Sequence, residues 1–146
     1  MPPTLNLAVP EDAATSTFTY TVPFFDTDAM GIVHHANYVR YLELARVQFL
    51  ADHDRPYDEY IAGGRHVAVI GVETRYHQAC RFDETLHITC WLRWVRAASL
   101  GFGYVIDKAG QKVVSATTDH AVVTLEGRPT RMPADVRSRL SSRVVT

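Results

Sequence analysis

The segment from residue 38 to residue 50 limits the folds open to this chain, because it is apolar around most of a helix. Apolar side chains recur every three or four positions, which gathers them on one side of a helix. They are Tyr38, Tyr41, Leu42, Ala45, Phe49 and Leu50. Val39, Leu44 and Val47 fall outside that stripe, so little more than a polar strip is left to face water. The strip consists of Arg40, Glu43, Arg46 and Gln48. We therefore predict a long helix that is mostly buried.

The start of this helix lies near residues 34–37. The first amide N–H groups of a helix have no partner within it and point at whatever lies ahead, so this end favours an anion. Asp28 precedes His35 on the far side of Gly31, a residue that allows a sharp turn. We expect the Asp28 carboxylate to fold back toward the helix start.

Alternation of apolar and polar residues predicts five strands, at residues 18–25, 67–77, 86–94, 100–106 and 113–125. A turn at residues 107–110 joins the last two as a hairpin. In the strand at 67–77, we expect a core to lie on the side that carries Ala68, Ile70, Val72, Thr74 and Tyr76. Pro56 predicts a short helical turn that ends at Gly63 and Gly64. Residues 133–142 predict a short exposed helix or a frayed end.

One long buried helix followed by antiparallel strands predicts an α+β fold in which the sheet wraps the helix. A chain of 146 residues is one domain by length. We expect residues 1–16 to form a flexible N-terminal tail and residues 17–146 a single domain. The tail has no basic residue and no continuous apolar run, so we expect neither a signal peptide nor a membrane anchor.

Charge and cysteine content restrict the partners and the compartment. The net charge of −1, from 15 basic and 16 acidic residues, gives no case for nucleic acid as a partner. No stretch approaches the roughly 20 apolar residues of a membrane span. We expect a cytoplasmic protein whose Cys80 and Cys90 are free, packed thiols. No glycine-rich phosphate-binding loop is present in the sequence.

The segment DTDAMGIVHHANYVRYLELAR resembles the signature of the hotdog-fold acyl-CoA thioesterases, in the 4-hydroxybenzoyl-CoA thioesterase-like branch. That pattern is D-x-D-x-x-G-x-V-x-x-x-N-Y, and its second, catalytic aspartate falls on Asp28 rather than Asp26. Weaker resemblance extends through VETRYHQACRFDE and GRPTRMP. The resemblance implies the hotdog fold, a five-stranded antiparallel sheet wrapped around one long central helix. It also implies a homodimer or homotetramer in which the strand at 67–77 pairs with its copy.

Thioester hydrolysis needs a base or nucleophile, a water, and donors aimed at the carbonyl oxygen. The resemblance implies that Asp28 is the general base or nucleophile, and the sequence leaves both roles open. It implies that the backbone N–H groups of His35 and Ala36 form the oxyanion hole, while the His35 side chain positions the thioester or water. The competing interpretation is that Asp28 only caps a turn.

We place four residues in the substrate pocket: Gly31, Asn37, Tyr38 and Tyr41. Of these, Asn37 and Tyr38 match the family's N-Y pair. For Asn37 and Tyr38, helix capping and core packing are the favoured interpretation. Tyr57 and Tyr60 are further candidates for the pocket, whose floor we expect to be built from both subunits. Coenzyme A would be part of the substrate, so we expect no separate cofactor. Its phosphates would need arginines, and the candidates are Arg81, Arg93, Arg96, Arg128 and Arg131.

Several residues near the motif allow other interpretations. Asp26 is expected to be structural, and His34 a packing residue. A metal site would use ligand types present at Asp26, Asp28, His34 and His35, but adjacent histidines rarely converge on one ion, so we expect none. Glu43 is a rival base, although an ion pair with Arg40 or Arg46 is favoured. Glu73 is expected to be a cross-strand partner.

Two other functions compete with an acyl-CoA thioesterase. A thioesterase on the same scaffold could release acyl or polyketide chains from an acyl carrier protein. A non-catalytic acyl-CoA-binding module is the alternative from a different class, since a fold does not guarantee its chemistry.

Overall fold

The computed structural model describes residues 7–144 of the chain. In this range the elements are β1 (Thr15–Thr21), a 3-10 turn η2 (Phe24–Asp26), α1 (Asn37–His53), α2 (Tyr57–Ala62), β2 (Arg65–Tyr76), β3 (Thr85–Val95), β4 (Ser99–Lys108), β5 (Gln111–Thr124) and α3 (Ala134–Ser141). The strands form one sheet in the order β1-β3-β4-β5-β2, and all neighbours are antiparallel. The predicted α+β arrangement is confirmed.

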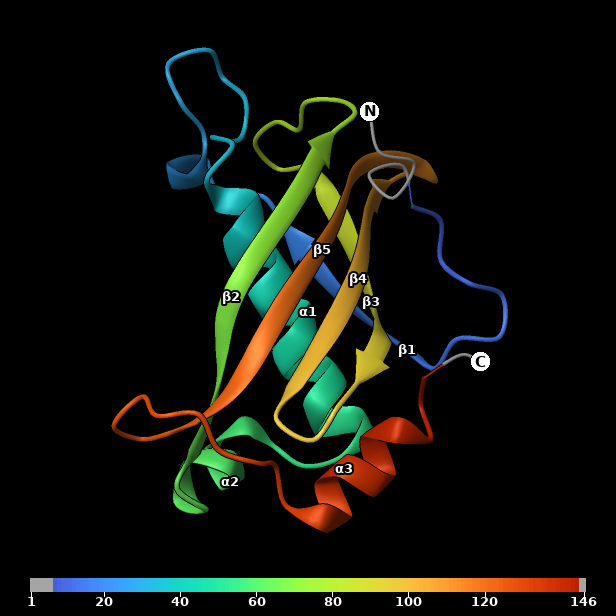
Figure 1. The fold of residues 1–146 in the computed structure, drawn as a ribbon. Helices are drawn as coiled ribbons and strands as arrows, with labels where there is room; N and C mark the ends of the chain where they lie inside the picture. The colour runs from blue at the N-terminus through green and yellow to red at the C-terminus, as the bar shows by residue number, and fades with distance from the viewer. Residues whose placement is uncertain (1–6, 145–146) are drawn as a thin grey trace.

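The helix α1 runs along one face of the sheet and supplies much of the core (Figure 1). The whole predicted stripe is buried: Tyr38, Tyr41, Leu42, Ala45, Phe49 and Leu50. Phe49 meets Phe102 of β4 edge to face, with ring centroids 5.7 Å apart. Burial of each large apolar side chain contributes about 1.5–3 kcal/mol, so this stripe fixes the helix against the sheet.

One residue of the expected polar strip is buried instead. Arg46 donates from Nη1 to the Tyr104 hydroxyl at 3.1 Å, and that hydroxyl lies 2.6 Å from Thr118 Oγ1. Its Nη2 lies 3.7 Å from Glu43 Oε1. A buried cation is tolerated only when its N–H groups find partners. The expectation that Arg46 faces water was wrong, because the sheet supplies hydroxyls that the helix sequence does not reveal.

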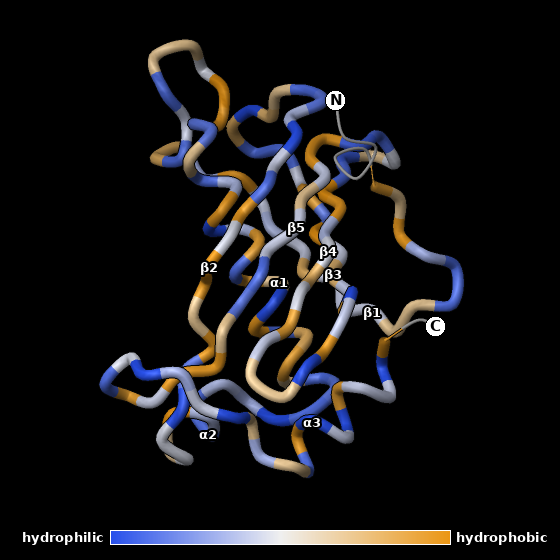
Figure 2. Tube along the Cα trace, viewed as in Figure 1, coloured by the Kyte–Doolittle hydropathy of each residue, from blue (hydrophilic) through white to orange (hydrophobic). Residues whose placement is uncertain are grey.

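The strand β2 lies at one edge of the sheet and pairs only with β5. A register shift between Val69 and Gly71 changes which side chains face inward. Ile70 is 65% exposed, and Val72 and Tyr76 are also exposed, so the expected apolar core side was wrong for this chain. Figure 2 shows the hydrophobic residues along this edge. Val39 and Val47 of α1 are exposed as well.

The first strand differs from its predicted bounds. It begins at Thr15 and ends at Thr21, so Thr15 and Ser16 of the expected tail belong to the sheet. Pro23 has no N–H to donate to a ladder, and the chain turns into η2, where Phe24 and Phe25 are exposed. Residues 7–14 contain no helix or strand. Residues 1–6 of the expected tail lie outside the described residues.

The predictions for the short helix, the hairpin turn and the two cysteines are confirmed. The short helix α2 starts after Pro56, and its C-cap is Gly63. A turn at Ala109 and Gly110 joins β4 to β5. Cys80 and Cys90 are free and buried. Among the described residues, every helix is too short or too polar to act as a membrane span.

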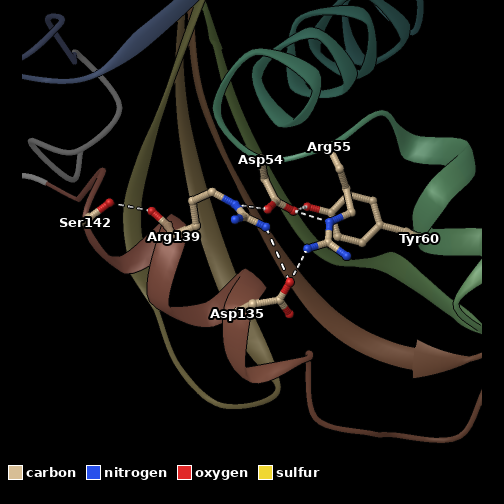
Figure 3. Close-up of polar contacts among 6 residues, drawn as sticks. All are labelled: Asp54, Arg55, Tyr60, Asp135, Arg139 and Ser142. Carbon is tan, nitrogen blue, oxygen red and sulfur yellow. Dashed lines mark hydrogen bonds and ion pairs between the residues drawn. The ribbon is translucent and has the colours of Figure 1, made fainter.

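The C-terminal helix α3 is less exposed than expected, because Val136 and Leu140 are buried in the core. A polar network holds it against the end of α1 (Figure 3). The fully buried side chain of Asp54 lies 2.6 Å from Arg139 Nε and 3.3 Å from Arg55 Nε, and it accepts a hydrogen bond from the Tyr60 hydroxyl. On the surface, Asp135 lies 2.6 Å from Arg55. The network connects α1, α2 and α3.

Removing the central carboxylate should loosen this end of the protein. We expect Asp54→Ala to lower the free energy of unfolding by about 2–3 kcal/mol. That is less than the full cost of stranding a buried charge, since the side chains of Arg55 and Arg139 stay 25% and 43% exposed. Asp135→Ala, at an exposed member of the network, should cost less than about 1 kcal/mol. Urea denaturation measures both, and equal losses would contradict a central role for Asp54.

Candidate active site

The loop between η2 and α1 is a small hairpin that projects beyond the sheet (Figure 1). Thr27 and Val33 form an antiparallel bridge, and the Asp28 N–H donates to the Ile32 carbonyl at 2.9 Å. The Gly31 N–H donates back to the Asp28 carbonyl at 2.9 Å, with Gly31 at φ +78°. A residue with a Cβ is strained at that angle. Gly31 therefore serves to reverse the chain beside Asp28.

The Asp28 side chain is half-buried at the tip of this hairpin. Its Oδ1 accepts a hydrogen bond from the Met30 N–H at 2.8 Å, the turn-capping contact that the sequence allowed. The same side chain lines an open groove. One carboxylate oxygen thus fixes the orientation of the group, while the group as a whole faces a cavity that a substrate can enter.

The helix start presents one free donor. The Ala36 N–H donates to Nδ1 of His34 at 3.2 Å, and the His34 and His35 rings stack with centroids 4.2 Å apart. Within the described residues, the His35 N–H donates to no carbonyl or side chain. Of the two predicted oxyanion donors, His35 is therefore unengaged, and Ala36 is held by the neighbouring histidine.

The groove has a volume of about 410 Å³ and lies between two segments of the chain. The hairpin and helix start contribute Asp28, Met30, Ile32, Val33, His35 and Tyr38. The end of β2 and the residues after it contribute Tyr76, His77, Gln78 and Ala79. The Tyr76 hydroxyl donates to the His35 carbonyl at 3.2 Å, and the Val33 N–H donates to the Cys80 carbonyl at 2.8 Å. These bonds hold the two walls together.

Asp26 is structural, as predicted, and its carboxylate is only 1% exposed. Oδ2 accepts hydrogen bonds from the hydroxyls of Tyr41 at 2.6 Å and Tyr20 at 3.2 Å, and Arg40 lies 3.3 Å from Oδ1. Burial, together with the Asp26 carboxylate, raises the pKa of Tyr41 well above its usual value. The hydroxyl therefore stays protonated and donates. This cluster fixes the hairpin to α1.

The other expected pocket residues are placed as follows. Tyr38 lines the groove and packs into the core, and its ring lies 5.4 Å from that of Tyr76. Tyr41 is buried against Asp26. The Asn37 side chain donates to the Asp26 carbonyl at 2.8 Å. Neither of these two, nor Gly31, is among the groove-lining residues.

Tyr57 and Tyr60 belong to a different part of the molecule. They lie on α2, near the far end of α1 from the groove (Figure 1). Tyr57 contacts His66 at 3.2 Å, and Tyr60 joins the Asp54 network. They do not line this chain's groove, because α2 follows a helix of 17 residues that spans the length of the sheet. Their place in a pocket built from two subunits stays a prediction.

The other candidates for a base or a metal ligand make structural contacts instead. Glu43 pairs with Arg46 rather than lining the groove, which confirms the predicted i,i+3 pair. Glu73 lies opposite Thr117 on β5. Across the described residues, no group of three His, Cys, Asp or Glu side chains is placed to hold a metal ion. Asp26 was one of the candidate metal ligands, but its carboxylate accepts hydrogen bonds from two tyrosines.

The arginine candidates for a phosphate contact differ in position. Arg81 is exposed and lies beside the hairpin, where a Cβ added to Gly31 would be 3.7 Å from its Nη1. Arg93 pairs with Asp119 at 3.6 Å, and Arg96 stacks on Trp94. Arg128 and Arg131 are exposed near the start of α3. Arg81 is the candidate nearest to the Asp28 hairpin.

Sequence reasoning missed the wall that follows β2. The His77 N–H donates to the Val113 carbonyl at 2.7 Å, and Gln78 Nε2 donates to the Lys112 carbonyl at 3.1 Å. These contacts depend on the register between β2 and β5, which the sequence does not specify. The polar pair His77 and Gln78 breaks the strand's alternation, and that break was the available signal.

Removing a donor to Asp26 should test the anchor of the hairpin. We expect Tyr41→Phe to lower the free energy of unfolding by about 1–2 kcal/mol, because a buried carboxylate oxygen loses its shorter hydrogen bond. The matched variant Tyr20→Phe removes the longer bond to the same oxygen and should cost less. Urea denaturation compares the two. A larger loss for Tyr20→Phe would show that Tyr41 is not the main anchor.

The chain matches the sequence profile of the family described as the thioesterase-like superfamily over residues 22–140. It is 32% identical over 115 residues to the "Putative esterase" of Aquifex aeolicus, which covers 79% of this chain and 89% of that protein. It is 33% identical over 81 residues to the acyl-CoA thioester hydrolase YbgC of Escherichia coli, which covers 56% of this chain and 60% of that protein. The crystal structure of a hypothetical protein from Thermus thermophilus superimposes with a TM-score of 0.86 at 29% identity, covering 91% of this chain and 100% of that one.

Proposed function

Since the chain belongs to the thioesterase-like superfamily and is a thioester hydrolase with the hotdog fold, we propose that it hydrolyses acyl-CoA thioesters to a free acid and coenzyme A. The observation that supports this most directly is the groove, in which the Asp28 carboxylate and the start of α1 face the same space. The apolar side chains of Met30, Ile32 and Val33 line the same groove and suit an acyl group.

Asp28 is the proposed general base or nucleophile. As a base, it takes a proton from a water that attacks the acyl carbon. As a nucleophile, its free oxygen attacks that carbon to give a mixed anhydride, which water then hydrolyses. In both routes the C–S bond breaks and sulfur leaves as a thiolate. The Met30 N–H bond to Oδ1 supports either role, since it holds the carboxylate in one orientation.

The helix start would stabilise the charge that grows on the carbonyl oxygen. The unengaged His35 N–H is the first donor, and a helix N-terminus adds a favourable field. The Ala36 N–H becomes the second donor when the His34 ring moves aside, since His34 Nδ1 occupies it at 3.2 Å. The His35 side chain, which also lines the groove, would position the thioester or the water.

The substrate's handle is proposed to be coenzyme A, and no separate cofactor is required. Arg81, exposed beside the hairpin, is suited to a phosphate contact at the mouth of the groove. Release of an acyl or polyketide chain from a carrier protein uses the same bond cleavage. Matched acyl-CoA and acyl-carrier substrates separate the two, because a strong preference for the carrier would overturn the coenzyme A assignment. A cytoplasmic location and the lack of nucleic-acid and membrane partners stay predictions.

Asp28→Asn tests the catalytic assignment. We expect turnover of the best substrate, found with a panel of short, medium, long and aryl acyl-CoAs and a thiol-trapping dye, to fall about 10²-fold or more. Asp83→Asn makes the same change at an exposed aspartate outside the groove and should leave turnover unchanged. Near wild-type activity of Asp28→Asn would refute the role of Asp28. Activity lost on treatment with a chelator would favour the metal alternative instead.

Assembly is the second part of the proposal. The edge strand β2 exposes Val69, Ile70 and Val72, and Val39 of α1 lines the same surface hollow as Val69 and Val72. An apolar edge strand with unpaired N–H and C=O groups favours pairing with a copy of itself. We propose a dimer or tetramer in which β2 of a second copy covers the Asp28 groove, so that each site forms between two subunits.

Ile70→Glu should separate the subunits, because it places two like charges at the paired edge. Light scattering at micromolar concentration should show a dimer or tetramer for the wild type and a monomer for the variant. Activity should fall at least about tenfold, since small misplacements are costly in a shared site. Leu125→Glu, the same change at an exposed leucine beyond the end of β5, is the control. A fully active monomer would rule out the shared site and leave Asp28 to its own test.

A further inference from the structure

The wall of the groove opposite Asp28 carries three polar side chains, and two of them are occupied. The Tyr76 hydroxyl donates to the His35 carbonyl at 3.2 Å, and Gln78 Nε2 donates to the Lys112 carbonyl at 3.1 Å. The third, His77, has Nε2 at 2.9 Å from Ser115 Oγ. Within the described residues, no hydrogen bond reaches its Nδ1. His77 lines the groove and therefore has one ring nitrogen that no described residue occupies.

Contacts with β5 hold the His77 imidazole in one position. Its backbone N–H donates to the Val113 carbonyl at 2.7 Å, and Ser115, which contacts the ring, is fully buried on β5. In the tautomer in which Nε2–H donates to the Ser115 hydroxyl, Nδ1 carries a lone pair. That nitrogen can then accept a hydrogen bond from a water in the groove.

Partial burial and nearby cations favour the neutral form of His77. Partial burial and the cations Lys112 on β5 and Arg75 on β2 lower the pKa of His77 below the ordinary histidine value of 6.5. The other titratable side chains of the groove are Asp28, His35 and Tyr38 on the opposite wall and Tyr76 on the same wall. At neutral pH the ring is thus in the form that accepts a proton, and it becomes protonated only in more acidic solution.

We propose that His77 is a second catalytic residue of this site, with Nδ1 hydrogen-bonded to the water that attacks the acyl carbon. This inference rests on the proposed thioesterase function. If Asp28 is the base, the water oxygen bonds to the acyl carbon, one of its protons passes to the Asp28 carboxylate while the other stays hydrogen-bonded to His77 Nδ1, and the C–S bond breaks with its electron pair on sulfur. The proton then leaves to the thiolate or to solvent. If Asp28 is the nucleophile, the same water attacks the acyl carbon of the mixed anhydride, its proton passes to His77 Nδ1, and the bond between that carbon and the Asp28 oxygen breaks to regenerate the carboxylate.

His77→Gln and Ser115→Ala test the assignment in the full chain. We expect His77→Gln to lower kcat about 10²-fold while KM for the best acyl-CoA changes less than about threefold. Ser115→Ala, which removes the partner of Nε2, should lower kcat by a smaller factor of about 3–10. His87→Gln makes the same change on β3, where the ring contacts Thr19 outside the groove, and should leave kcat unchanged. Melting temperatures identify any variant that is merely misfolded.

The pH profile distinguishes a chemical role from a structural one. The wild type should lose kcat/KM as pH falls through the pKa of His77, which lies below the ordinary value of 6.5, because protonated His77 can no longer accept a hydrogen bond or a proton from the water. In His77→Gln that part of the acid limb should disappear, so the loss relative to the wild type shrinks at low pH. An unchanged kcat, or an unchanged acid limb, in His77→Gln would overturn the inference while wild-type turnover leaves the thioesterase function intact. A wild type that hydrolyses no thioester would overturn both.

Discussion

The site depends on the interactions of the buried Asp26 carboxylate. This carboxylate accepts hydrogen bonds from the hydroxyls of Tyr20 on β1 and Tyr41 on α1, and it forms an ion pair with Arg40. Its backbone carbonyl accepts the His34 N–H at 3.0 Å and the Asn37 side chain. A carboxylate so far from water is stable only when its oxygens are satisfied. The hairpin that carries Asp28 is therefore fixed in one position relative to the helix start.

The two aspartates of the motif divide the work. Asp26 is buried and holds the chain, whereas Asp28, two residues further along, is half-buried and faces the groove. Their environments rather than their chemistry separate these roles. The chain turns at residues 28–31, and the Asp28 carboxylate lies away from the core, where it is open to a substrate. The Met30 N–H donates a hydrogen bond to one of its oxygens.

One wall of the groove comes from residues close to Asp28 in the sequence, and the other comes from residues far from it in the sequence. Residues 28–38 form the first wall through contacts close in sequence, and residues 76–79 form the second because β5 holds them beside the hairpin. At the opposite end of the molecule, Asp54 forms ion pairs with Arg55 and Arg139 in the region of α2 and α3. The free edge of β2 runs between these two ends, so the surface proposed for assembly is continuous with the site.

The sequence by itself determined the elements whose signals are local. The stripe of α1, the alternation of the five strands, the turn at Gly31 and the placement of Asp28 ahead of a helix start all follow from periodicity and backbone chemistry. The bounds of β1 were misplaced because alternation continued past the point where Pro23 ends the ladder. Tertiary structure alone decided the burial of Arg46, the exposure of Ile70 and the position of His77. Each of these depends on which strand lies alongside and in what register, and such non-local pairing leaves no periodic trace in the residues themselves.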